Sequence, residues 1–387
     1  MMHRTRNIWA SGAILLTLSL TAVPSSAQTL QPSQVELEGF NDVLTNGNDT
    51  AYMRGLTHRY VNGELRFLTL THRGILQEFR RPSGYGSTIS STTATWDLSG
   101  TGTIFDANGI WFEQAKNRLW IVGTVDYNAT NTPAKVTLLT LGTNGSVSVA
   151  KSFNLNMPAK RVYGGCQAVP AELISKLGGS YVCGWGGYTS LLLNGGGASI
   201  GATMYAIPDP DTITNGATVS PRTVMDHFES RGLRRTIPVN RYESNWQSPT
   251  GDGLGYQVWG DSYYNTGMWI GTSYVAVLSA CKGECWYENS TLNHRERQFE
   301  LHIWDGSTLG ANSTQRATSM TELTLPRDNT WAPLGNVTAG NVSGATYDPT
   351  SGRMFIVGYP FGAGGSSGRL FTSVSYTHLT LPTSDLV

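Results

Sequence analysis

One stretch of the chain, residues 109–123, recurs without a gap at residues 344–358. Each copy predicts a β-hairpin, because an aromatic strand, a polar turn and an apolar strand follow one another. A related hairpin at 55–69 has Asn62 and Gly63 at its turn, the pair that two-residue hairpin turns favour. Repeats of this size in a β-rich chain predict a propeller, in which each unit is one blade.

The spacing of the repeat bears on the number of blades. Recognisable units start at residues 55, 109, 165, 267 and 344, and the gap after 165 is almost two periods long. We therefore predict an all-β fold, a single β-propeller of six blades, with five or seven as alternatives. Residues 209–245, which contain several prolines, would be an insertion or a degenerate blade. The last unit ends early, so we expect a truncated last blade.

The N-terminal segment, residues 1–27, combines a basic start, an apolar run and small residues before Gln28. This pattern predicts a secretory signal peptide, and so a secreted or periplasmic protein. No later stretch reaches the roughly 20 apolar residues that a membrane-spanning helix needs. We expect the propeller to occupy residues 28–373, with the alternation at Val35–Phe40 able to close the ring.

The other end of the chain, residues 374–387, has a different origin. Its first part, Val374–Thr383, resembles the translation of a transposase-type sequencing adapter. We expect this tail to pack poorly or to form a makeshift edge strand, leaving Met354, Ile356 and Val357 exposed in an unclosed blade.

Composition limits the possible partners. The formal net charge is zero, only 14% of the residues are charged, and no basic block is present. Nucleic-acid and anionic-membrane binding need a basic surface, so both are set aside. No metal, phosphate-loop or dinucleotide motif appears, so we expect neither a metal nor a cofactor. The sequence says nothing about the oligomeric state.

Four cysteines in an exported chain favour disulfides. The local pairs are Cys281 with Cys285, across a presumed hairpin tip, and Cys166 with Cys183. Zinc is the alternative, but neither pair has the CxxC spacing and no flanking histidine completes a set of four ligands.

Propellers bind ligands at one end of the central channel, through segments that precede the innermost strands. Tyrosine and tryptophan faces with short polar neighbours suit a glycan or another small extracellular ligand. The residues of this kind are Arg161, Tyr163, Gln167, Asn245, Trp246, Asp261, Tyr263 and Tyr264. Aromatic residues beside hairpins more often pack between blades, and we assign that role to Trp120, Phe355, Trp269 and Trp304.

Other polar residues in the hairpins could be considered for catalysis. Glu113 and Asp348 recur at one position of the repeat, as a pair of catalytic carboxylates could, but we assign both to hydrogen bonding within turns and loops. The first unit carries His58 and Arg59, followed by His72 and Arg73, and we interpret both pairs as solvated faces of strands.

Two short motifs, Trp286–Asn289 and Gly344–Thr350, resemble those of uncharacterised exported bacterial β-propeller proteins. The resemblance covers the blade hairpins and implies no catalytic residue. The sequence thus favours an exported propeller that binds a glycan or similar ligand at the channel mouth. A polysaccharide-active hydrolase or lyase and a scaffold for protein partners are the alternatives.

Overall fold

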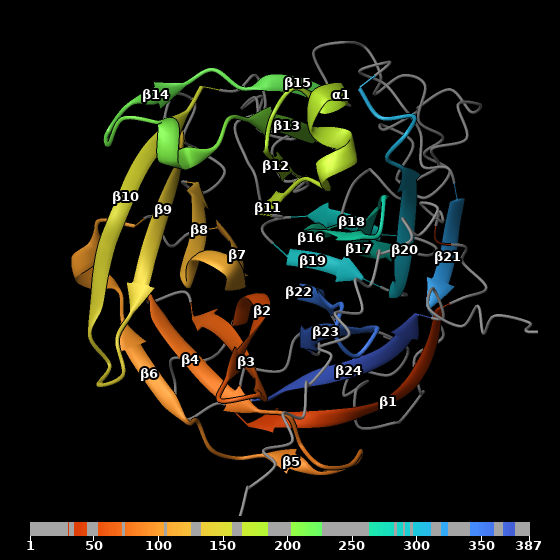
Figure 1. The fold of residues 1–387 in the computed structure, drawn as a ribbon. Helices are drawn as coiled ribbons and strands as arrows, with labels where there is room; N and C mark the ends of the chain where they lie inside the picture. Colours follow the sequence, from red (N-terminus) through yellow and green to blue (C-terminus); the bar gives the residue numbers. More distant parts are fainter. Residues whose placement is uncertain are drawn as a thin grey trace, which may run out of the picture.

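In the part of the chain that the computed structural model describes, five β-sheets stand around one axis as the blades of a propeller (Figure 1). The first strand of each blade lies nearest the axis, and the later strands lie progressively outward. The predicted all-β propeller is confirmed, with five blades where the spacing favoured six. The structure describes residues 30, 35–44, 53–71, 74–103, 107–124, 133–156, 165–184, 203–226, 263–281, 285–288, 291–294, 297–310, 319–323, 341–359 and 367–375.

The first three blades follow one another along the chain. Blade 1 consists of β2 (Met53–Val61), β3 (Glu64–Thr71), β4 (Ile75–Arg80) and β6 (Ala94–Asp97). Blade 2 consists of β7 (Ala107–Glu113), β8 (Arg118–Thr124), β9 (Ala134–Leu141), β10 (Val147–Leu155) and the added edge strand β14 (Thr218–Val219). Blade 3 consists of β11 (Cys166–Ala168), β12 (Tyr181–Gly184), β13 (Thr203–Ile207) and β15 (Arg222–Asp226).

The last two blades complete the ring. Blade 4 consists of β16 (Tyr263–Ile270), β17 (Ser273–Cys281), β20 (Arg297–Asp305) and β21 (Ser319–Leu323), and a separate ribbon is formed by β18 (Cys285–Glu288) and β19 (Thr291–His294). Blade 5 consists of β22 (Asn341–Asp348), β23 (Arg353–Tyr359), β24 (Ser367–Ser375), β1 (Val35–Leu44) and β5 (Thr88–Ile89). The short helices are η2 (Ser99–Thr101), η3 (Gln114–Lys116), η4 (Ala171–Leu173), α1 (Ile174–Leu177) and η5 (Pro210–Thr212).

The five blades are the five repeat units found in the sequence, and the described part of the irregular segment forms no blade of its own. Where residues 209–226 are described, they supply β14 to the edge of blade 2 and β15 to the edge of blade 3. Residues 227–245 lie outside the described part. The long gap between repeat units therefore includes edge strands of two existing blades.

The second strand of a blade is largely buried because both of its faces are covered by neighbouring blades, as the pattern of β3 shows. In β3, Phe67 joins a buried cluster with Phe355 of blade 5, whereas Leu68 joins another with Ile121 of blade 2. Successive side chains of a strand point to opposite faces, so each face of β3 supplies a different inter-blade core. The predicted packing roles of Trp120, Phe355 and Trp304 are confirmed, because all three are buried.

The glycines that open the repeats let the inner strands approach one another closely. A Cβ on Gly344 would overlap the backbone of Gly55 and Leu56 in the neighbouring blade. A Cβ on Gly165 would lie 3.1 Å from the carbonyl carbon of Gly109, and Gly165 also has a positive φ of 77°. A side chain at these positions would push two blades apart, which explains why glycine marks the start of the units.

The N-terminal strand closes the ring, as the sequence suggested. β1 pairs antiparallel with β24 from Val35 opposite Ser375 to Leu44 opposite Ser367. The expected truncation of the last blade is therefore wrong, because the start of the chain supplies the outer strand. Met354, Ile356 and Val357 are buried rather than exposed. Residues 374 and 375 extend β24, and residues 376–387 lie outside the described part.

Residues 84–89, which lie between β4 and β6 of blade 1 in the sequence, contact the other edge of β1. Asn41 donates from Nδ2 to the carbonyl oxygens of Gly84 (2.8 Å) and Ser87 (3.2 Å), and Gly86 donates its backbone N–H to Phe40 (2.9 Å). β5, at the end of this segment, pairs parallel with β1. The closing strand is thus held by blade 5 on one edge and by blade 1 on the other.

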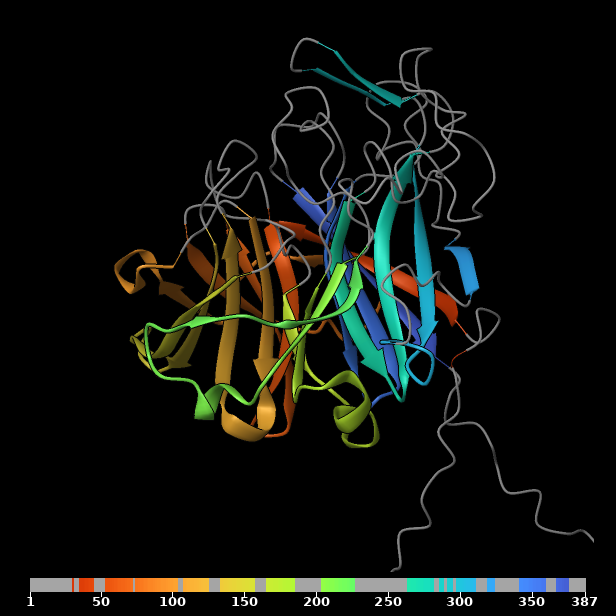
Figure 2. The same ribbon diagram turned by 90° about the horizontal axis from the view of Figure 1, so that it is seen from above.

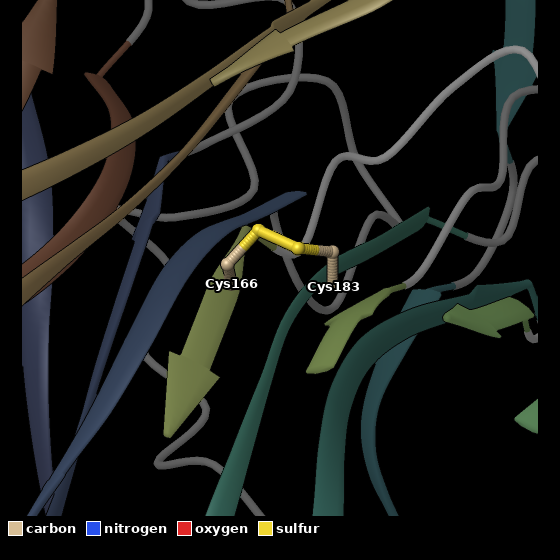
Figure 3. Close-up of a disulfide and its surroundings, with 2 residues drawn as sticks. All are labelled: Cys166 and Cys183. Atoms are coloured by element: carbon tan, nitrogen blue, oxygen red, sulfur yellow. A yellow bond between two sulfur atoms is a disulfide. The ribbon is translucent and has the colours of Figure 1, made fainter. Parts of the chain in front are cut away.

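One predicted disulfide is present. Cys166 of β11 and Cys183 of β12 are cross-strand partners and form a buried bridge (Figure 3). It ties the innermost strand of blade 3 to its neighbour. The side chains of Cys281 and Cys285 are outside the described set, so their bridge stays a prediction. None of the helices in the described ranges is long and apolar enough to cross a membrane.

Candidate functional site

The ligand-binding residues predicted from the sequence lie largely outside the described ranges. Gln167 is in β11 and the backbones of Tyr263 and Tyr264 are in β16. The predicted residues outside the described part are Arg161, Tyr163, Asn245, Trp246 and Asp261. Their role in binding stays a prediction.

Gln167 joins two inner strands. Its Oε1 accepts a hydrogen bond from the backbone N–H of Trp269 at 3.3 Å, so β11 and β16 are neighbours at the centre of the ring. Tyr163 precedes Gln167 by four residues and Tyr263 precedes Trp269 by six. β11 and β16 therefore meet at one blade junction. Because its side chain accepts the hydrogen bond that connects β11 to β16, Gln167 has a structural role.

One polar cluster among the described residues surrounds Asp348, where blade 5 meets blade 1. The Asp348 carboxylate is fully buried and accepts hydrogen bonds from the backbone N–H of Thr350 (3.0 Å), from Ser351 Oγ (2.5 Å) and from Tyr60 OH (2.8 Å). The first two bonds shape the β22–β23 turn, and the third crosses to β2. Asp348 therefore holds a turn and a blade junction together.

His58 of β2 lies beside the same carboxylate. Its Nδ1 is 2.9 Å from Thr346 Oγ1 and its Nε2 is 3.9 Å from Asp348 Oδ1. Burial lowers the pKa of His58 below 6.5, and the nearby Asp348 only partly offsets this. Burial raises the pKa of Asp348, but hydrogen bonds from Ser351 and Tyr60 outweigh it and bring that pKa below 3.8. The pair is thus a neutral imidazole next to a carboxylate.

Another cluster surrounds Glu113, where blade 2 meets blade 3. Glu113 Oε2 accepts from Arg118 Nε (2.5 Å) and Trp120 Nε1 (2.9 Å), and Oε1 accepts from Tyr181 OH (2.6 Å). Tyr181 lies on β12 of the next blade, so this bond also crosses a blade junction. Burial, followed by the hydrogen bond to Glu113, raises the pKa of Tyr181 to about 12. This tyrosine keeps its proton and remains a donor at any physiological pH.

Exposed charges extend this cluster toward the surface. Asp211, in η5, accepts from Arg118 Nη1 (2.6 Å) and from Lys116 Nζ (2.5 Å). Hydrogen bonds from Lys116 and then from Arg118 lower the pKa of Asp211 to about 2. Asp209 also accepts from Lys116 at 3.2 Å. The residues that connect β13 to β14 are thereby attached to the β7–β8 turn.

The histidine and arginine of the first repeat are not the solvated face that the sequence suggested. Only 17% of the His58 side chain and 14% of the Arg59 side chain is exposed. Arg59 Nε donates to Glu78 Oε2 at 2.6 Å, and its guanidinium lies 5.2 Å from the centre of the Trp96 ring. Both residues face neighbours rather than water. His72 and Arg73 are not among the described residues.

These contacts support the structural interpretation of Glu113 and Asp348. Both carboxylates are buried, and each is used fully by a turn, a strand or the adjoining blade. Neither has an oxygen free for a substrate, and each belongs to a different blade junction. Sequence reasoning missed their partners Tyr60 and Tyr181, because these residues lie at unrelated positions of the repeat. No group of three or more metal-binding side chains gathers among the residues described.

Comparison with known proteins shows structural similarity only. No family model and no curated protein matches this chain. A member of the DUF4221 family from Bacteroides vulgatus is 8% identical with a TM-score of 0.40, over 90% of this chain and all of its own. An exo-1,5-α-L-arabinanase from a bovine ruminal metagenomic library is 11% identical with a TM-score of 0.42, over 83% of this chain and 92% of its own.

A third solved structure is a putative glycosidase from Bacteroides thetaiotaomicron. It is 7% identical with a TM-score of 0.44, over 84% of this chain and 87% of its own. Similarity at this level does not extend to a substrate or an activity. The class defined by the described residues is a propeller of five blades, two of whose junctions are held by buried polar clusters.

Proposed function

We propose that this protein is an exported β-propeller that binds an extracellular glycan at one end of the central channel. The site would be formed by the segments that lead into β11 and β16. Its members are the predicted residues Arg161, Tyr163, Asn245, Trp246, Asp261, Tyr263 and Tyr264. Tyrosine and tryptophan rings can stack on the apolar face of a sugar, while amide, carboxylate and guanidinium groups can bind its hydroxyls.

The hydrogen bond between Gln167 and Trp269 is the observation that carries this proposal. It makes β11 and β16 adjacent although about a hundred residues separate them in the chain. In the sequence, an aromatic and polar segment precedes each of these two adjacent strands. A binding site assembled from loops on a rigid scaffold has this organisation.

At the opposite end of the propeller, three of the connections are short turns. Asn62 and Gly63 form the β2–β3 turn with positive φ, η3 forms the β7–β8 turn, and Asp348 organises the β22–β23 turn. These turns suit a supporting face. The buried Cys166–Cys183 bridge fits folding in an oxidising compartment, as export would provide.

The test is a glycan-array screen of the purified full-length protein, followed by titration of any glycan that binds. We expect Tyr263→Ala and Tyr264→Ala each to weaken binding by about fivefold or more, since a stacked ring contributes about 1 kcal/mol or more. Tyr85→Ala is the control, because Tyr85 is 45% exposed and lies against Gly39 of the closing strand. Absence of glycan binding, or equal loss in all three variants, would refute the proposal.

The same samples separate binding from hydrolysis. A hydrolase or lyase would release new reducing ends or unsaturated products from the bound polysaccharide, whereas a binding protein would leave it intact. Glu113 and Asp348 are committed to blade junctions, so an enzyme would need its acids in the segments around the proposed site.

A further inference from the structure

Leu30 lies in the core between blades 4 and 5, although in the sequence it precedes the first strand of the propeller. Its side chain is fully buried, and its backbone N–H donates to Ser273 Oγ of β17 at 2.8 Å. β1 itself belongs to the sheet of blade 5. Figure 2 shows the start of β1, in red, next to β21 of blade 4, and the view in Figure 1 agrees. Leu30 thus connects the N-terminal part of the chain to the neighbouring blade.

The cluster around Leu30 draws on both blades. It contains apolar side chains of β16, β17 and β20 from blade 4, and of β22, β23 and β24 from blade 5. Val35 and Phe40 of β1 pack against the same cluster and are only partly buried. Removing a leucine from such a core loses the burial of its side chain and leaves a cavity. Leu30 therefore contributes a large part of the apolar contact by which the N-terminal residues are held.

β1 has a second fixed point at its bulge. The register of β1 against β24 shifts between Leu37 and Gly39, and Glu38 lies at that shift. The Glu38 carboxylate accepts from Arg353 Nε (2.9 Å) and Nη2 (3.0 Å). Hydrogen bonding to Arg353 is the main cause of a Glu38 pKa below 4.5, so this pair is ionised at neutral pH. Because Arg353 belongs to β23, the pair spans β24 and joins β1 to the middle of blade 5.

The contacts of β1 and of Leu30 reach different parts of the ring. The strand pairings of β1 reach β24 in blade 5 and β5, and Leu30 adds a contact with blade 4. The ends of a chain fray unless they are tied down, and a strand near an end can open while the rest of a protein stays folded. A buried side chain just ahead of the strand opposes such opening.

We propose that Leu30 is a lock on ring closure. Its insertion between blades 4 and 5 holds β1 on β24, and its release lets β1 open as a local unit while the other blades stay folded. The open state exposes the edge of β24, which in the closed ring is covered by β1. The lock therefore sets how often the ring opens, whatever ligand the propeller binds.

The experiment is hydrogen exchange of the native full-length protein, followed by mass spectrometry on peptides from each blade. In Leu30→Ala we expect the amides of β1 and β24 to exchange about tenfold faster or more, because burial of a leucine contributes more than the ~1.4 kcal/mol that a factor of ten requires. The amides of β8 and β9 should change by less than about twofold, since a local opening leaves them protected.

Leu119→Ala is the matched control. Leu119 of β8 is as completely buried as Leu30, in the core between blades 1 and 2. Its loss should accelerate exchange in β1 no more than in β8. Ser273→Ala removes the acceptor of the Leu30 N–H and should accelerate exchange in β1 and β24 by about fivefold. Glu38→Gln should have a smaller effect than Leu30→Ala, because a partly exposed ion pair contributes less than a buried leucine.

The location of the faster exchange decides the result. Unchanged exchange of β1 in Leu30→Ala would overturn the lock. Equal acceleration in all five blades would also overturn it, because Leu30 would then contribute to global stability alone. If Leu30→Ala does not fold, Ser273→Ala decides: acceleration confined to β1 and β24 supports the lock, and acceleration that is uniform or absent overturns it. None of these outcomes depends on glycan binding, so the lock and the proposed function are tested separately.

Discussion

Removal of the Glu113 carboxylate should destabilise the propeller more than any change among the exposed charges around it. Glu113 is 6% exposed and accepts three hydrogen bonds, from Arg118, Trp120 and Tyr181. In Glu113→Ala the buried Trp120 indole N–H loses its partner, and Arg118 keeps only Asp211 and Tyr181.

The magnitude follows from these partners. A buried donor left without a partner costs about 1–3 kcal/mol, and breaking a buried ion pair costs about 3–5 kcal/mol. We therefore expect Glu113→Ala to lower the free energy of unfolding by about 4 kcal/mol. For a propeller of this size, that loss corresponds to a decrease in Tm of roughly 6 °C.

Urea unfolding followed by tryptophan fluorescence measures this loss. Asp211→Ala is the matched control, because it removes an acid from the same arginine but at an exposed position, where ion pairs contribute about 0–1 kcal/mol. Tyr181→Phe should fall between the two, at about 2 kcal/mol, since it removes one hydrogen bond to a charged group. If Glu113→Ala lowered the free energy of unfolding no more than Asp211→Ala, the Glu113 cluster would not stabilise the junction of blades 2 and 3 as its geometry indicates.

Three further predictions address the other structural features. Burial lowers the pKa of His58 below 6.5, so as the pH falls this imidazole is protonated in the unfolded chain before it is protonated in the folded protein. The free energy of unfolding should therefore decrease as the pH drops below about 6.5. A series of Tm values measured against pH should show a smaller decrease for His58→Gln than for the wild type. The Cys166–Cys183 bridge spans a sequence separation of 17, and its replacement by two serines should cost about 3 kcal/mol in urea unfolding, whereas an equal midpoint with and without the bridge would contradict this. Gly344→Ala should cost about 1–3 kcal/mol, because the new methyl group would overlap the backbone of the neighbouring blade, while Gly84→Ala has open space and should change stability by less than about 0.5 kcal/mol.

The sequence predicted those features of the fold that the repeat encodes locally. Five hairpin units, the Asn62–Gly63 turn and the Cys166–Cys183 pair each depend on residues close together in the chain. The closing role of residues 35–40 was visible because an unpaired alternating strand at one end of a propeller has an obvious place. Local patterns and turn chemistry thus accounted for the blades.

Contacts across blade junctions were the part that local patterns missed. Tyr60 and Tyr181 bind equivalent acids, yet one is on a first strand and the other on a second strand. The repeat constrains the acid, and any neighbouring element that reaches it can supply the donor. The number of blades was overestimated for a related reason, since β14 and β15 serve blades that begin earlier in the chain.

The pairing of β1 with β24 also determines the order in which this protein can fold. The first strand to leave a ribosome or a translocation channel is the last to find its main partner, because Ser367–Ser375 follow more than three hundred residues later. Of the contacts described above, β1 can until then make those with residues 84–89, through β5 and through the hydrogen bonds of Asn41 and Phe40. Closure of the ring by β1 and β24 therefore requires nearly the whole chain.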